Sequence, residues 1–205
     1  MKYSLIIDTS SEYSLVGLAT DHQLIQAQIE LHANQLGSSL LPTIDALIKQ
    51  ANISIQDLSE IIVGIGPGSY TGTRVGVAVA KALSFGLKIP LRTFCSLLAF
   101  LPSFCGSFAC VMPSRTGDFF LLKGHQSKTH LETTFSALVS LPELIEALPG
   151  VDHILGKPLD EVRQKLGLSH LILPTPGLST PLLYIASSQG ALTKDSGDLI
   201  YLHQP

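Results

Sequence analysis

The same order of predicted strands and helices occurs in both halves of this chain of 205 residues. In each half, alternating or β-branched apolar runs predict strands, and apolar residues three and four apart predict helices, in the order βββαβαβα. Such a repeat restricts the chain to an α/β fold of two lobes, each with a mixed sheet, that face each other across a cleft. Pro and Gly in the stretch 102–107 place the boundary between a first lobe, 1–105, and a smaller second lobe, 106–205.

The first lobe is predicted to begin with an antiparallel meander of three strands. Its elements are strands over Tyr3–Asp8, Tyr13–Ala19 and Leu24–Leu31, a helix over 38–51, a strand over 61–65, a helix over 71–86, a strand over 89–93 and a short helix over 96–101. The alternation of Ile25, Ala27 and Ile29 predicts that their side of the third strand is buried. We expect Pro42 in the first turn of its helix, where a missing N–H costs nothing.

The second lobe is predicted to repeat this order. Its strands are expected over 108–112, 118–124, 129–134, 153–155 and 170–173, and its helices over 141–148, 158–166 and 180–192. The last helix could pack back on the first lobe.

Composition excludes several classes of protein. Charged residues make up 14% of the chain and the net charge is −3, so the chain is not intrinsically disordered and has no basic footprint for binding nucleic acid alone. Cys95, Cys105 and Cys110 lack metal-ligand spacing and are expected to be reduced and buried, which fits a cytoplasmic protein. The uncharged stretch 93–114 is predicted to be buried core and not a membrane span, because prolines and a glycine interrupt it.

The segment GIGPGSYTGTRVG, residues 64–76, joins a predicted buried strand to a helix. It is neither a Walker A loop, nor a GxGxxG fingerprint, nor a GxSxG nucleophile elbow. A helix N-terminus behind such a turn can bind an anion, and Asp8 at the end of the first strand could hold Mg²⁺ through water. Asp8, Gly66, Gly68 and Ser69 are therefore a candidate site for ATP or ADP. The alternatives are a tight turn without a ligand and an Asp that caps nearby N–H groups.

Other chemistry finds no support in the spacing of polar residues. The seven histidines form no HxxxH or HExxH motif, and no Ser/His/Asp or Cys/His set can be nominated. We predict no catalytic residue, no metal ligand and no required cofactor.

The helix over 71–86 is apolar around most of its circumference. Arg74 and Lys81 lie seven residues apart and share one narrow stripe. A helix of this kind must be covered on most sides. Two coverings are open, a second protein or the lobe itself, and we expect a second protein. Gly72 and Gly76, four residues apart, would allow another helix to approach closely.

Three segments resemble the TsaB (YeaZ) family. They are Ile7-Asp8-Thr9-Ser10, Leu40-Leu41-Pro42-Thr43-Ile44 and, above all, GPGSYTGTRVG over 66–76. The resemblance is strong over residues 1–100. It departs at Tyr70, where Phe is usual, at Thr73, where Leu is common, and at Ser114, which replaces an acidic residue. It implies a small actin-like ATPase superfamily member with two ribonuclease-H-like lobes.

The resemblance also implies a function. Members of this family take part in forming N6-threonylcarbamoyladenosine at position 37 of tRNAs that read codons beginning with A. They are non-catalytic scaffold or activator subunits that form a heterodimer with a larger metal-binding paralogue, TsaD, and a small ATPase, TsaE, joins the pair. Contact with tRNA is expected only through the complex, and a homodimer is also open. The alternative function is an autonomous nucleotide-binding phosphotransferase or ATPase of the same superfamily; a peptidase lacks support.

In that family the helices at 38–51 and 71–86 make the contact between subunits. The residues that we expect at this partner interface are Leu40, Ile44, Leu47, Arg74, Val75, Ala78, Val79 and Ala82.

Overall fold

The computed structural model describes residues 2–20, 24–31, 36–100, 105–114, 116–127 and 131–156. The first lobe is built on a five-stranded sheet in the order β3-β2-β1-β4-β5. Its strands are β1 (Tyr3–Asp8), β2 (Tyr13–Ala19), β3 (Leu24–Leu31), β4 (Leu58–Gly64) and β5 (Leu91–Phe94). β1, β2 and β3 form an antiparallel meander, whereas β4 and β5 run parallel to β1. The mixed sheet is therefore as predicted.

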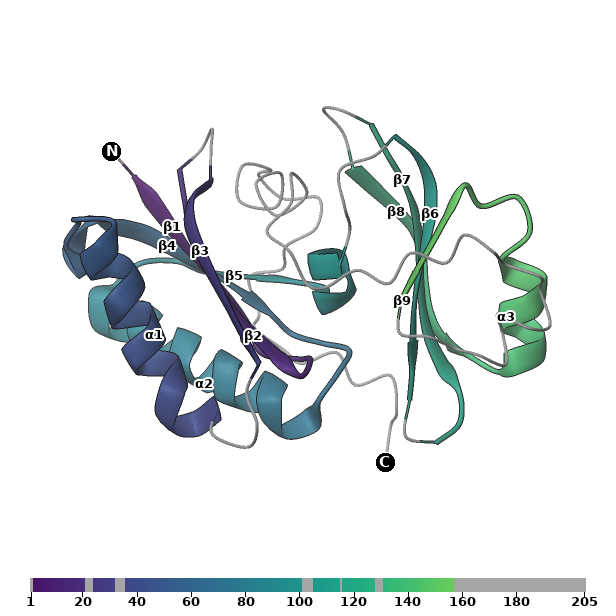
Figure 1. Ribbon diagram of the computed structural model, residues 1–205, viewed down its shortest axis with the longest axis horizontal. Coiled ribbons are helices and arrows are strands. Elements are labelled where there is room, and N and C mark those ends of the chain that lie inside the picture. The colour runs from purple at the N-terminus through teal and green to yellow at the C-terminus, as the bar shows by residue number, and fades with distance from the viewer. Residues whose placement is uncertain are drawn as a thin grey trace.

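Two helices, α1 (Leu36–Gln50) and α2 (Tyr70–Leu87), cover one face of this sheet (Figure 1). Their inward residues pack on alternate residues of β1, β2 and β4, such as Leu5, Val16 and Val63, in one apolar core. A 3-10 turn, η1 (Ile55–Asp57), precedes β4. Pro42 is wrongly predicted to lie in the first turn of its helix, because α1 begins at Leu36 and Pro42 therefore lies in the second turn.

The burial predicted for β3 is wrong. Ile25, Ala27 and Ile29 are exposed, and both isoleucines keep 37% of their surface open. The polar residues between them face α1 instead, since Gln26 donates a hydrogen bond to Gln50 and Glu30 accepts one from Thr43 at 3.3 Å. Period-two alternation locates two faces of a strand, but it does not say which face the neighbouring helix covers.

The second sheet repeats the order of the first. Its order is β8-β7-β6-β9, formed by β6 (Gly106–Pro113), β7 (Phe119–Gln126), β8 (Leu131–Val139) and β9 (His153–Gly156). β6 and β9 are parallel, as β1 and β4 are. A short helix, α3 (Leu141–Ala147), packs on this sheet through Leu144. The elements expected beyond residue 156 lie outside the described residues. So do residues 102–104 of the stretch 102–107 in which the lobe boundary was expected, and the boundary stays a prediction.

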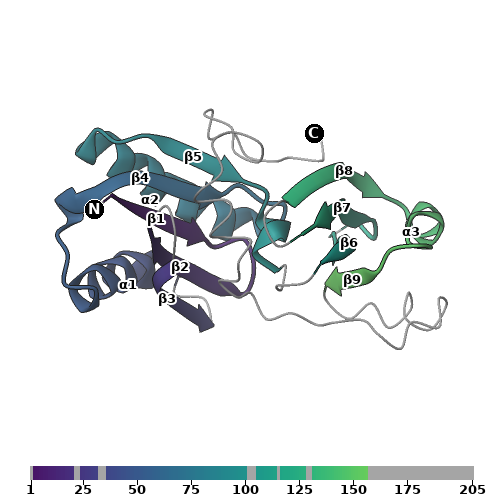
Figure 2. The same cartoon turned by 90° about the horizontal axis from the view of Figure 1, so that it is seen from above.

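The two sheets share one apolar core. A 3-10 helix, η2 (Ser96–Phe100), lies between them (Figures 1 and 2). The shared core joins residues from both sheets and from η2: Ile6, Leu15, Ala19, Ile62, Phe94, Leu97, Leu98, Ala99, Phe108, Cys110, Leu122, Leu131 and Leu155. Because one core serves both lobes, we expect them to unfold together.

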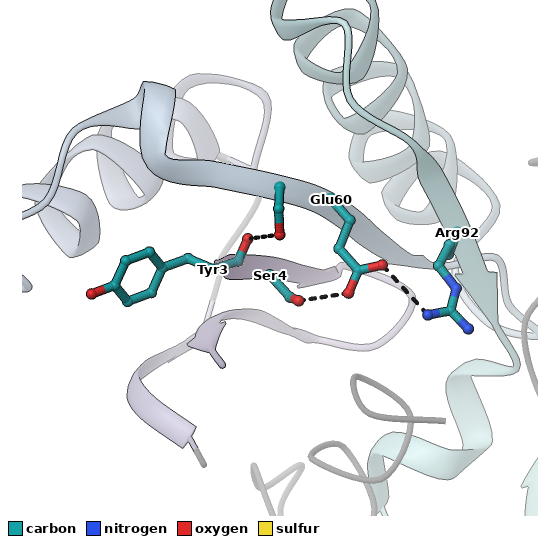
Figure 3. Close-up of polar contacts among 5 residues, drawn as sticks. Tyr3, Ser4, Glu60 and Arg92 are labelled. Carbon is teal, nitrogen blue, oxygen red and sulfur yellow. Dashed lines mark hydrogen bonds and ion pairs between the residues drawn. The ribbon is translucent and has the colours of Figure 1, made fainter. Parts of the chain in front are cut away.

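A polar network lies on the same face of the first sheet as this core (Figure 3). Glu60 on β4 accepts a hydrogen bond of 2.6 Å from Ser4 Oγ on β1 and an ion pair of 3.4 Å from Arg92 on β5. The side chains of Glu60 and Arg92 are only 16% and 15% exposed. The network therefore ties three neighbouring strands together across the sheet.

The structure also bears on the predictions about a membrane span and about the cysteines. No helix among the described residues is both long and apolar enough to cross a lipid bilayer. The cysteines are free, as expected, and burial raises the pKa of the Cys95 thiol to about 12. Cys105, however, is exposed, because it lies at the start of the segment that leads into β6 and outside both cores.

Candidate functional site

Asp8 ends β1 in a buried position. The residue is 4% exposed, and its Oδ1 accepts hydrogen bonds from the Ser10 backbone N–H at 2.9 Å and the Ser10 hydroxyl at 2.7 Å. Its Oδ2 is buried without a hydrogen-bond partner among the described residues. Burial raises the pKa of the Asp8 carboxyl above its ordinary value, and the neighbouring Ser96 and Ser10 groups oppose that rise. Asp8 Oδ1 thus accepts the hydrogen bonds that are typical of a turn-forming Asp, whereas Oδ2 accepts none from the described residues.

The glycines of the turn pack against the end of β1. A Cβ at Gly64 would lie 1.7 Å from Asp8 Oδ2, and one at Gly68 would lie 2.2 Å from the Ser10 carbonyl oxygen. Gly72 and Gly76, one and two helical turns farther on, would clash in the same way with Thr9. The four glycines, spaced four residues apart, therefore let the turn and α2 approach β1. This corrects the prediction that Gly72 and Gly76 face another helix.

Three N–H groups of the turn are used by the chain itself. Gly66 N–H donates to Ser96 Oγ at 2.9 Å, Ser69 N–H donates to the Ser10 carbonyl at 2.5 Å, and Gly72 N–H donates to Ser69 Oγ at 3.2 Å. Gly66 and Pro67 are also buried, whereas Gly68 and Ser69 are exposed. An anion site needs several N–H groups that point at the ligand. These three N–H groups are therefore engaged within the chain, and a site for ATP or ADP at this turn stays a prediction.

The outward face of α2 is the second candidate site. Arg74, Ala78, Lys81, Ala82 and Phe85 are all exposed, and Phe85 keeps 87% of its surface open to solvent. At the start of the helix, the Arg74 guanidinium lies 3.9 Å from the centre of the Tyr70 ring. Contiguous apolar patches on a surface can mark sites where another protein binds, and here Phe85 lies on the same exposed face as Ala78 and Ala82. Burying one phenylalanine in such a contact is worth roughly 1.5–3 kcal/mol.

The predicted partner interface needs correction. Leu40, Ile44 and Leu47 are at most 2% exposed, because the sheet of the same lobe covers their side of α1. They cannot touch a partner in this fold. Val75 and Val79 are half-buried and pack partly against the same core. Arg74, Ala78 and Ala82 do lie on the open face of α2.

Sequence reasoning missed the most exposed large apolar residue of this surface, Phe85. Phe85 stands four residues after Lys81 and eleven after Arg74, so the stripe shared by these two cations continues to Phe85. Following the stripe from Lys81 for one more helical turn, to residue 85, would have identified Phe85. On α1, Leu41 is 53% exposed and was also overlooked.

The remaining titratable residues form no metal centre. No group of three or more His, Cys, Asp or Glu side chains within the described residues could hold a metal ion. One exposed polar cluster at the edge of the second sheet joins Asp152 to Ser107, whose N–H and hydroxyl donate to Asp152 Oδ2 at 2.8 and 2.7 Å.

The sequence model of the family described as "TsaD: tRNA N6-adenosine threonylcarbamoyltransferase" matches residues 24–170, which is more than half of the chain. The chain belongs to this family. Among curated relatives, the "tRNA threonylcarbamoyladenosine biosynthesis protein TsaB" of Bacillus subtilis is 32% identical over 119 residues, 57% of this chain and 52% of that protein. The protein of the same name from Escherichia coli is 32% identical over 87 residues, 42% of this chain and 37% of that protein.

Solved structures support the fold over nearly the whole chain. YeaZ from Pseudomonas aeruginosa superposes with a TM-score of 0.77 at 20% identity, covering 98% of this chain and all of that one. The ethanolamine utilization protein EutJ from Carboxydothermus hydrogenoformans reaches 0.50 at 13% identity over 90% of this chain and 89% of its own. These likenesses confirm the predicted two-lobed α/β fold. The aligned part of this chain spans about half the length of the curated relatives or less.

Proposed function

We propose that this TsaB-like chain is a non-catalytic subunit of the machinery that forms N6-threonylcarbamoyladenosine in tRNA, and that it acts by binding a TsaD-like catalytic paralogue. A TsaE-like ATPase would join the pair, and tRNA would contact the chain only through the complex. The observation that supports this proposal most strongly is the open face of α2, where an almost fully exposed Phe85 lies beside small apolar residues. The names of the curated relatives supply the pathway.

A surface of this kind favours a protein partner over a small molecule. α2 is convex, and its exposed residues alternate between cations and apolar side chains along one side of the helix. Small-molecule sites are concave and enclose most of their ligand, whereas a helix face suits a helix or groove of another protein. The Asp8 region, by comparison, is filled by the chain's own glycines and serines.

Reconstitution tests the proposed function. The purified chain would be mixed with a TsaD-like protein and a TsaE-like ATPase of the same organism. A threonylcarbamoyl donor and unmodified tRNA would then be added as substrates. We expect modified adenosine only when the chain is present with the TsaD-like protein, and none from the chain alone. Full activity without the chain, or activity of the chain alone, would contradict the proposal.

A second candidate function is an autonomous nucleotide-binding phosphotransferase. One observation favours it, namely the buried Asp8 Oδ2 that has no partner among the described residues. Titration calorimetry with ATP and Mg²⁺ separates the two candidates. Binding that Asp8→Asn abolishes would support the phosphotransferase, whereas absence of binding by a chain that still activates its partner would exclude it.

A further inference from the structure

β3 (Leu24–Leu31) is an edge strand of the first sheet. It pairs with β2 on one side, and no described strand pairs with its other side, which lies across the sheet from β5 (Figure 2). The N–H and C=O groups along such an edge are a template for pairing with a further strand. We refer to the unpaired side of Leu24–Leu31 as the β3 edge.

The β3 edge lacks most of the features that block pairing. Its sequence, LIQAQIEL, contains no Pro, Lys or Arg, and its one charged residue, Glu30, stands near the C-terminal end. Proteins protect their edges with prolines, lysines, short strands or bulges. A bulge is present at Ile25, which the register with β2 skips, and the pairing is regular from Gln26 onward. The strand therefore offers a short and nearly uncharged edge.

One face of β3 is an exposed apolar stripe. Ile25, Ala27 and Ile29 are exposed, and each isoleucine keeps 37% of its surface open. Ile29 pairs with Leu15 of β2, which belongs to the core that both sheets share. The stripe therefore extends the apolar side of the first sheet beyond the shared core and up to the β3 edge. Apolar side chains on an unpaired edge favour association.

The sequence around Ala27 is palindromic, since the five residues centred on it read IQAQI in both directions. An antiparallel pair of two β3 strands about a two-fold axis at Ala27 would bring Ile25 of one copy opposite Ile29 of the other. It would likewise bring Gln26 opposite Gln28. Opposite residues share one face of a sheet. Apolar side chains would thus meet on one face and amides on the other, whereas a shift by one residue would set isoleucine opposite glutamine.

We propose that the β3 edge binds the β3 edge of a second copy of this chain, antiparallel and about a two-fold axis at Ala27, so that the first sheets of two copies join into one. Each copy contributes the same surface, as closed two-fold dimers require. Glu30 of one copy lies opposite Leu24 of the other, so the two carboxylates do not meet. The inference goes beyond the proposed function, because it concerns β3 and needs no other protein.

Sedimentation of the full chain at increasing concentration tests the proposal first. A contact made by one pair of strands is small, and interfaces that bury less than about 1,200 Å² are typical of weak or transient complexes. We therefore expect monomers at about 1 µM and mostly dimers at about 500 µM.

A substitution on the two-fold axis should abolish this dimer. Ala27→Lys would set two ammonium groups opposite each other at an exposed position, and we expect it to weaken self-association about tenfold or more. The matched control is Ser136→Lys, an exposed position on β8, which is the edge strand of the second sheet. The control should leave self-association unchanged. Circular dichroism of both variants checks that they are folded.

A disulfide test fixes the register. Directly opposite Cα atoms of antiparallel strands lie about 4.5–5.5 Å apart, which suits a disulfide. In a chain whose exposed Cys105 is changed to Ser, Ala27→Cys should therefore link to itself. Oxidised glutathione would accept the two electrons and two protons that the thiols lose. Ile29→Cys should not link to itself, because the two residues 29 would lie about 13 Å apart along the strands.

Several outcomes would overturn the proposal. A chain that stays monomeric at the highest concentration would do so, and so would a dimer that Ala27→Lys leaves intact. Loss of the dimer with Phe85→Ser but not with Ala27→Lys would place the contact on α2 instead. Equal self-linking of Ala27→Cys and Ile29→Cys would contradict the two-fold register. The proposed function is tested separately, by reconstitution, and stands or falls independently of these results.

Discussion

The two sheets share a topology but differ at the places where function could reside. In both, a central strand pairs with an antiparallel neighbour on one side and a parallel one on the other. Within the described residues, the first sheet carries two long helices with an open, partly apolar face, whereas the second carries one short helix whose Leu144 is fully buried. The comparison teaches that the repeated topology builds a scaffold twice, while the described surface that suits a partner lies on the first lobe.

The two central strands, β1 and β6, also end differently. β1 ends in Asp8, which lies buried beneath a glycine-rich turn. β6 ends at Pro113, which is exposed. Glycine is nevertheless required beside both strands, since a Cβ at Gly64 or at Gly156 would clash with the neighbouring central strand. Close approach of parallel strands is thus common to both lobes, whereas among the described residues the buried carboxylate is found in the first lobe.

The largest expected effect tests how tightly the lobes are coupled. Phe108 is fully buried in the core that both sheets share, whereas Leu144 is fully buried in the core of the second lobe. Phe108→Ala should cost about 3–5 kcal/mol and Leu144→Ala about 2–5 kcal/mol. Because the two lobes are expected to unfold together, hydrogen exchange of the most protected amides should rise in both β4 and β7 for both variants. A rise confined to β7 for Leu144→Ala would show that the shared core does not couple the lobes.

A second prediction concerns the glycine packing of the first lobe. Gly72→Ala places a Cβ 2.2 Å from the Thr9 carbonyl oxygen, whereas nothing lies within 4 Å of a Cβ at Gly86 on the same helix. We expect Gly72→Ala to lower the free energy of unfolding by about 3 kcal/mol. The matched control, Gly86→Ala, should leave it unchanged or raise it by up to about 1 kcal/mol. Urea denaturation measures both, and similar values for the two variants would contradict the packing.

The sequence predicted the features that local patterns encode, and it missed those that depend on contacts between distant residues. β1, β2 and β3 fall within their predicted bounds, because short polar turns and apolar runs define them locally. Leu40, Ile44 and Leu47 were expected at an interface because the resemblance implies that their helix contacts a partner. Periodicity marks these residues as a buried stripe without saying what covers it, and here the sheet does. The same ambiguity misplaced the buried face of β3. The role of Gly72 and Gly76 depended on Thr9, a contact across 63 residues or more that spacing does not reveal.

The buried carboxylate should give the first lobe its own pH dependence. Burial raises the folded-state pKa of Asp8 above the ordinary 3.8, so the folded chain binds the proton more tightly than the unfolded chain does. Its contribution to stability therefore falls as pH rises from about 4 through the folded-state pKa. Asp8→Asn should remove this fall, so that the two unfolding curves diverge above pH 4. Parallel curves for both chains from pH 4 to pH 8 would count against a raised pKa.

Asp152, an exposed acidic residue of the second lobe, should give a smaller pH dependence of stability with the opposite sign. The Ser107 hydroxyl and N–H, with the nearby charges of His153 and His125, hold the pKa of Asp152 below its ordinary 3.8. Its stabilising contribution is present above that pH and lost as pH falls through the lowered folded-state pKa. Asp152→Asn should lower the melting temperature slightly at pH 6 and not at pH 2. A double-mutant cycle with Ser107→Ala would then give a coupling energy, and zero coupling would refute the link.

The open face of α2 receives its most direct test in cells that depend on this chain. Cells depleted of their own copy would receive Phe85→Glu, or Glu146→Lys on the exposed side of α3 as the matched control. The modified adenosine content of their tRNA would then be measured by mass spectrometry. We predict that Phe85→Glu abolishes threonylcarbamoyladenosine while the folded protein accumulates normally, and that Glu146→Lys leaves it unchanged. Normal modification with Phe85→Glu would contradict the proposal that this face holds the partner.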